Sequence, residues 1–266
     1  VLLGASVSAA TVIAIGPGLL AGTAVVVVLA LAISYGIGRL LRLPPRMAVL
    51  IACGNAICGN SAIAAVAPVV DAEAKDVSAA IAFTAVLGVA VVLLLPLLGA
   101  ALQLTDVRYG VLAGLTVYAV PQVLAATLPV GAVANQAGTL IKLVRVLMLG
   151  PVCLVLAILM AVRRREGEAV AAPRSGVAIH QLIPWFIIGF LLMMAARSTG
   201  LIPAAAVPVM ADTAKVLTAL SMAALGLSTD ARAVARSGVR IAAVVILSLL
   251  ALLGLALALI YLLALV

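Results

Sequence analysis

The stretch from Met47 to Val70, MAVLIACGNAICGNSAIAAVAPVV, decides how the rest of the chain is interpreted. It is long enough to cross the hydrocarbon core of a bilayer as a helix, and it carries no charged side chain. Its middle, CGNAICGNS (residues 53–61), interrupts the apolar run with asparagine, glycine and serine. This pattern predicts a membrane helix that is broken near its midpoint.

The composition of the whole chain agrees with a membrane location. Of 266 residues, 67% are hydrophobic and only 9% are charged, so a water-soluble surface cannot be built. Aromatic residues make up only 3%, which argues against the aromatic girdles of an outer-membrane barrel. The basic residues lie in short loops, so membrane topology explains them better than nucleic-acid binding. We expect an all-α polytopic membrane protein.

Breaks at charges and at Pro/Gly clusters divide the chain into nine expected spans. These are about 1–15, 18–38, 47–70, 77–98, 108–128, 139–162, 181–198, 207–227 and 238–264. The first is short and has no start signal, which predicts that further helices precede Val1. The longest polar stretch, 163–180, is interpreted as a cytoplasmic linker.

The spans fall into two groups, 1–98 and 108–264, within a single membrane domain, and the linker lies inside the second group. In each group an irregular span, 47–70 or 207–227, is followed by one last helix. Each group would hold five spans, counting a helix before Val1. Because five is odd, the second group would enter the membrane with opposite orientation, giving inverted five-helix repeats.

Every second loop is rich in Lys and Arg, which predicts the orientation. Loops 39–46, 99–108, 163–180 and 228–240 hold eleven basic residues, whereas the intervening loops hold three. The first set is therefore expected in the cytoplasm and the C-terminus outside, in a bacterial inner (plasma) membrane.

Every Asp and Glu falls in a loop or near the end of a span, which limits the chemistry available within the membrane. Paired carboxylates, a protease dyad and an acidic cation site are all excluded, and glycine-rich nucleotide motifs are absent. We therefore expect no enzyme, no cofactor and no metal. Cys53, Cys58 and Cys153 are interpreted as small apolar packing residues.

Lys142 and Arg145 are two charged residues within the span 139–162, three apart and so on one helix face. They either snorkel to the membrane interface or form part of an anion site. The broken span supports the second alternative, because Asn55, Asn60 and Ser61 are neutral donors and an interrupted helix exposes backbone N–H groups. The alternative for the broken span is tight helix packing through small residues.

A second irregular helix is indicated by Thr116, Tyr118, Pro121 and Gln122. Pro121 removes one backbone donor and frees the carbonyl one turn earlier, while Tyr118 and Gln122 would share a face at i, i+4. A plain proline kink and a binding role both fit this pattern.

Four stretches together resemble the YeiH family of bacterial membrane proteins, often labelled sulfate exporters. These are CGNAICGNSAIAAVAPVV (53–70), KLVRVLMLGP (142–151), PWFIIGF (184–190) and AALGLST (223–229). The family is similar to the bile acid/sodium symporter and Na+/H+ antiporter group, whose repeats cross at broken helices. The resemblance implies that 47–70 and 207–227 are the crossing pair.

One position departs from the family pattern. Where the family usually has a His-Glu pair, this chain has Tyr118 and Ala119. Both titratable groups are replaced. We therefore infer neither proton coupling at this position nor the family's substrate for this chain.

These observations together predict a secondary transporter or facilitator of a small anion, an inorganic oxyanion or a small organic anion, that works by alternating access. A ligand-binding sensor or an anion channel on the same fold is the alternative. The expected partners are the anion and the lipid bilayer, without nucleic acid, and a homo-oligomer is left open. The expected site residues are Asn55, Cys58, Gly59, Asn60, Ser61, Thr116, Tyr118, Gln122, Lys142, Arg145 and Ser221.

The orientation is tested with single cysteines in a cysteine-free background. An impermeant thiol reagent added outside should label Ala74→Cys and not Val170→Cys, because the loop at 163–180 is expected in the cytoplasm. The reverse labelling would contradict both the orientation and the inverted repeat.

Overall fold

The computed structural model describes residues 16–165, 185–203, 205–228 and 238–263. The regular structure in these ranges is helical throughout, and no strand occurs in them. The helices are α2 (Pro17–Leu40), α3 (Pro45–Cys53), η2 (Gly54–Cys58), α4 (Asn60–Val66), α5 (Ala74–Ala101), α6 (Asp106–Thr116), α7 (Val120–Thr127), α8 (Ala132–Leu147), α9 (Leu149–Arg165), α11 (Trp185–Ser198), α12 (Ala206–Ser228) and α14 (Val239–Leu262). The expected all-α polytopic membrane class is confirmed.

Four stretches of helix are long and apolar enough to cross a membrane among the described residues: Pro17–Leu40, Ala74–Ala101, Ala132–Met160 and Val239–Leu262. The third combines α8 and α9, which are separated by a turn at Met148. The sequence predicted a span of about 139–162, and the helix begins earlier, at Ala132. In the structure Thr139 donates a hydrogen bond to Asn135 Oδ1 (3.2 Å), so these polar groups lie on the helix itself.

In the described part of the chain, two expected spans leave the helical conformation partway along, and only one of them belongs to the expected crossing pair. The span at 47–70 is broken as predicted, into α3 with η2 and then α4. The prediction that 207–227 is the second broken helix is wrong, because α12 runs without interruption from Ala206 to Ser228. The second interruption lies instead between α6 and α7, at residues 117–119.

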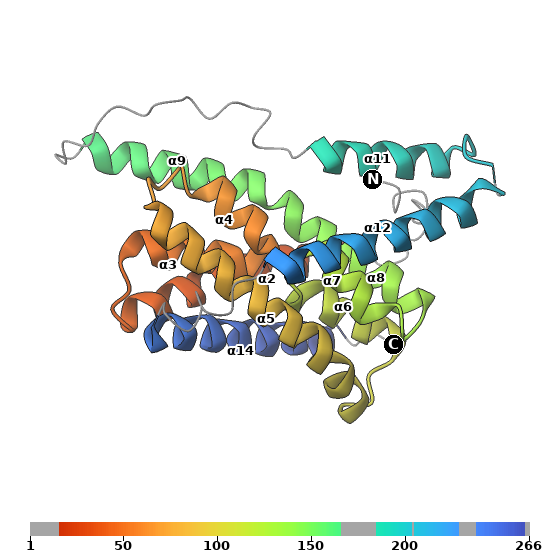
Figure 1. Ribbon diagram of the computed structural model, residues 1–266, viewed down its shortest axis with the longest axis horizontal. Helices are drawn as coiled ribbons and strands as arrows, with labels where there is room; N and C mark the ends of the chain where they lie inside the picture. The colour runs from red at the N-terminus through yellow and green to blue at the C-terminus, as the bar shows by residue number, and fades with distance from the viewer. Residues whose placement is uncertain (1–15, 166–184, 204, 229–237, 264–266) are drawn as a thin grey trace.

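The interior of the bundle is built around α8. Helix α6 packs along α8, α7 packs beside both, and η2 also contacts α8. On the other side α2 packs against α3 and α14. In Figure 1, α14 runs along the lower edge and α11 stands clear of the bundle at the upper right, while α12 extends from that side toward α7, which it contacts.

Helices α6 and α8 approach each other closely through small residues. A Cβ added at Gly110 would collide with the backbone carbonyl of Ala134, and one added at Gly138 would lie 2.9 Å from the Gly110 carbonyl oxygen. The two backbones are therefore nearly in contact, which is how small residues pack membrane helices.

Gly110→Ala should lower the free energy of unfolding by about 1–3 kcal/mol, because the added methyl group must push the two backbones apart. Gly254→Ala on α14 is the matched control, since nothing lies within 4 Å of the added atom, and it should cause no loss of stability. Thermal unfolding in detergent compares the two. Equal stability of both variants would contradict the close approach.

Candidate functional site

The break in the first interrupted helix is made at Gly59. Its φ of 64° and ψ of −126° lie outside the helical region and are accessible mainly to glycine. The Gly59 N–H bonds back to the Gly54 carbonyl (2.8 Å), which closes the last turn of η2. The next carbonyls, from Asn55 onward, have no partner within this helix and must find donors elsewhere.

The second break results from Pro121. In a continuous helix the N–H of residue 121 would bond to the Val117 carbonyl, and proline has no N–H. The chain instead becomes extended at Val117 (ψ 144°) and Ala119 (ψ 150°), and α7 begins at Val120 with Pro121 in its first turn. The prediction that Pro121 frees a carbonyl one turn earlier is confirmed.

Lys142 and Arg145 donate to the carbonyls that both breaks set free. Lys142 Nζ donates to the carbonyl oxygens of Ile57 (2.6 Å) and Val117 (2.9 Å). Arg145 bonds four carbonyl oxygens: Nε donates to Ala56 (3.0 Å), one terminal nitrogen donates to Gly114 (2.9 Å) and Val117 (3.2 Å), and the other donates to Asn55 (2.9 Å). We call this set of six hydrogen bonds the carbonyl clamp.

Both cations of the carbonyl clamp are fully buried, with 0% exposure. Snorkelling to the interface, the first of the two alternatives for this pair, is therefore wrong. Both side chains instead point into the bundle, where they bond backbone carbonyls. No carboxylate interacts with either cation among the described residues, and the ion pairs Arg46–Asp71 and Lys75–Glu73 lie elsewhere.

Tyr118 joins the two breaks through its side chain. Its hydroxyl donates to Asn55 Oδ1 (2.7 Å), and a Cβ added at Gly59 would lie 3.1 Å from the Tyr118 Cβ. Because Tyr118 lies between α6 and α7, it does not share a helix face with Gln122 as expected. Gln122 Oε1 instead accepts from the Ala119 N–H (3.1 Å) at the start of α7.

The other expected site residues are only partly brought together. Asn60 is half-buried and accepts from the Thr84 hydroxyl (2.7 Å), and Ser61 beside it is exposed. Cys58 is buried as a free thiol close to both cations. The Thr116 hydroxyl bonds the Leu112 carbonyl of its own helix (2.7 Å). The side chain of Ser221 lies outside the described part of the structure.

The sequence did not reveal Thr84, nor that five backbone carbonyls would accept from the two cations, those of Asn55, Ala56, Ile57, Gly114 and Val117. Pro121 signalled that the Val117 carbonyl would be free, but nothing local signalled its partner. Thr84 gave no signal, because a threonine in a membrane helix most often bonds its own backbone, as Thr84 also does to Ala80 (3.1 Å).

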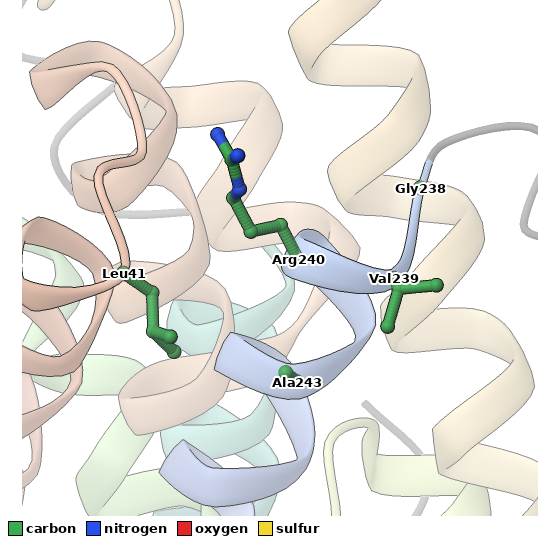
Figure 2. A pocket seen from close by; sticks show the side chains of 5 residues that line it. All are labelled: Leu41, Gly238, Val239, Arg240 and Ala243. Atoms are coloured by element: carbon green, nitrogen blue, oxygen red, sulfur yellow. The ribbon is translucent and has the colours of Figure 1, made fainter.

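A surface pocket lies apart from the carbonyl clamp. It has a volume of about 620 Å³ and is lined by Leu41, Gly238, Val239, Arg240 and Ala243. Figure 2 shows the Arg240 and Leu41 side chains pointing in different directions, so they do not converge on a common point. Among the described residues, no group of three or more His, Cys, Asp or Glu side chains could hold a metal ion.

Comparisons with known proteins place the chain among membrane proteins. The family model described as conserved hypothetical protein 698 matches residues 1–248. A UPF0324 membrane protein of Brucella melitensis is 59% identical over 263 residues, 99% of this chain and 71% of that protein. A UPF0324 membrane protein of Bradyrhizobium diazoefficiens is 52% identical over 260 residues (98% and 72%), and one of Bacillus cereus is 35% identical over 230 residues (86% and 66%). These matches confirm the resemblance to the YeiH family. No solved structure matches.

Arg145→Lys should lower the free energy of unfolding by about 2–5 kcal/mol, because a single ammonium cannot replace a fork that bonds four carbonyls and each buried carbonyl left unpaired costs about 1–3 kcal/mol. Arg46→Lys is the matched control. Arg46 and Asp71 are 3.5 Å apart with side chains 45% and 62% exposed, so this change should cost less than about 1 kcal/mol. Chemical denaturation in detergent measures both, and equal losses would argue against the carbonyl clamp.

Proposed function

The chain belongs to the conserved hypothetical protein 698 family of membrane proteins, and we propose that it is a secondary transporter or facilitator of a small anion that works by alternating access. One observation carries the proposal: two fully buried cations meet the ends of two interrupted helices, with no carboxylate partner among the described residues. The proposed location is a bacterial inner membrane with the C-terminus outside.

The charge balance at the carbonyl clamp supports an anionic substrate. The carbonyl ends of η2 and α6 each contribute roughly −0.5 elementary charge, and the N–H ends of α4 and α7, which begin at the same two breaks, each contribute roughly +0.5, so the four helix ends nearly cancel. Lys142 and Arg145 together carry +2 when both are protonated. No carboxylate among the described residues compensates this positive charge, which lies in a poorly solvated region where an anion would be strongly favoured.

The geometry of the hydrogen bonds limits which groups touch the anion. Arg145 uses four of its five N–H donors on carbonyls, so it contributes mainly charge. The Lys142 ammonium uses two of its three N–H donors on carbonyls, which leaves one donor for a ligand. Asn60 and Ser61 are the more accessible polar residues near Cys58, and we assign them to the path by which the anion reaches Lys142.

The interrupted helices provide elements that can move. Each break separates a half-helix held by the carbonyl clamp, α3 with η2 or α6, from a short half-helix beyond it, α4 or α7. Rotation about Gly59 or residues 117–119 would change access to Lys142 without breaking the clamp. Binding without transport, as in a sensor or a channel, would use the same contacts, and flux measurements separate the alternatives.

Asn60→Leu should abolish stabilisation by an anion, because it removes a polar side chain from the access path and fills the space with an apolar one. In the wild type, ligand at about a hundred times Kd adds about 2.7 kcal/mol of stability. Thermal unfolding with and without sulfate or nitrate measures this, and uptake into proteoliposomes separates transport from binding.

The matched control is Asn135→Leu. Asn135 is also half-buried and also accepts from a threonine hydroxyl, but it lies near the start of α8, away from the breaks. Both variants lose one hydrogen bond, worth about 0.5–1.5 kcal/mol, and only Asn60→Leu should lose the anion effect. An undiminished anion effect in Asn60→Leu would remove Asn60 from the site.

A further inference from the structure

Lys142 and Arg145 differ in one respect that matters for coupling. An arginine side chain keeps its proton under all conditions a protein meets, whereas a lysine can be neutral or charged. Arg145 is therefore always charged in the carbonyl clamp, whereas the charge of Lys142 depends on whether its amine is protonated. The charge at the carbonyl clamp then has two states: about +1 when Lys142 is neutral and about +2 when it is protonated, because the helix ends at the two breaks nearly cancel.

The two hydrogen bonds of Lys142 are compatible with both states. A neutral amine has two N–H donors, which suffice for the carbonyls of Ile57 and Val117. An ammonium has three, and the third has no acceptor among the described residues. Loss of the proton therefore leaves the carbonyl clamp intact, while gain of a proton adds both a charge and a free donor.

The neighbours of Lys142 provide no other group that would balance its charge. Arg145 lies one turn away on α8, and η2 contributes the Cys58 thiol. Tyr118, between α6 and α7, faces Arg145, and Cys153 on α9 lies near Cys58. The described parts of α2, α6 and α7 bring no carboxylate to Lys142. A protonated Lys142 must therefore be compensated by a ligand.

We propose that Lys142 is the proton-carrying group and that each anion is bound and moved together with one proton. The inference rests on the proposed anion transport. On the loading side the Lys142 amine takes a proton from water and the anion enters beside the ammonium. On the opposite side the anion leaves and the ammonium returns its proton to water, which leaves the neutral amine. No other bond forms or breaks, and a monovalent anion is carried without net charge movement.

The test measures proton uptake on anion binding by the purified chain in weakly buffered detergent, with a pH dye and with sulfate and nitrate as probes. Both probes stay fully ionised over the range used. Over the pH range in which Lys142 is neutral in the free protein, we expect the wild type to take up about one proton per anion bound, and its affinity to fall about tenfold for each unit by which the pH rises.

Two variants separate charge from hydrogen bonding. Lys142→Gln keeps two N–H donors without a charge, and should bind the probes at least tenfold more weakly, with no proton uptake and no pH dependence. Lys142→Arg, where it folds, should bind at all pH values without proton uptake. Lys75→Gln is the control, because Lys75 is exposed at the start of α5 and its loss should leave proton uptake unchanged.

The outcomes distinguish the coupling from the transport proposal. Tight binding of sulfate or nitrate with no proton uptake would overturn the role of Lys142 and leave the anion site standing. Proton uptake that persists in Lys142→Gln would assign the proton to another group. Failure of both probes to bind the folded wild type would overturn the proposed function and the coupling with it.

Discussion

Unpaired backbone carbonyls inside an apolar bundle are the constraint on which the rest of this structure depends. A helix that stops within a membrane leaves its last carbonyls without donors, and each would cost several kcal/mol in hydrocarbon. Here two helices stop at nearly the same place, and Lys142 and Arg145 supply donors for both ends. The cations depend on the carbonyls in turn, because neither cation would be tolerated at 0% exposure without these acceptors.

The sequence predicted the membrane class and the local causes of irregularity better than the partners. Hydrophobic length identified the helices, and Pro121 correctly indicated a freed carbonyl, because both effects depend only on neighbouring residues. The pairing of Lys142 with Ile57, 85 residues apart, depends on how the helices pack and has no local signal. For the same reason the sequence could not decide between a snorkelling and a buried pair.

The wrong assignment of a break to α12 has a physical explanation. Its Thr218, Ser221 and Gly226 lower the preference for helix, but each keeps its backbone N–H, so they permit an interruption without requiring one. Pro121 and Gly59 are different. The first removes a donor and the second adopts a φ of 64°, which ends the regular helix. Small polar residues alone are therefore weak evidence for a broken membrane helix.

The distribution of polar contacts also indicates where movement is least costly. The carbonyl clamp ties α8 to the ends of η2 and α6 with six hydrogen bonds, so these elements should move as one unit. In contrast, α2 and α14 are joined within the bundle by an apolar interface with one buried hydrogen bond, from Ser34 to Ser248 (2.9 Å). Sliding along apolar surface exchanges one set of van der Waals contacts for another, whereas moving the clamp would leave several carbonyls unpaired. Under the alternating access that we propose, Lys142 and Arg145 would therefore move with their acceptors as a rigid group, and the half-helices α4 and α7 would change their position relative to it.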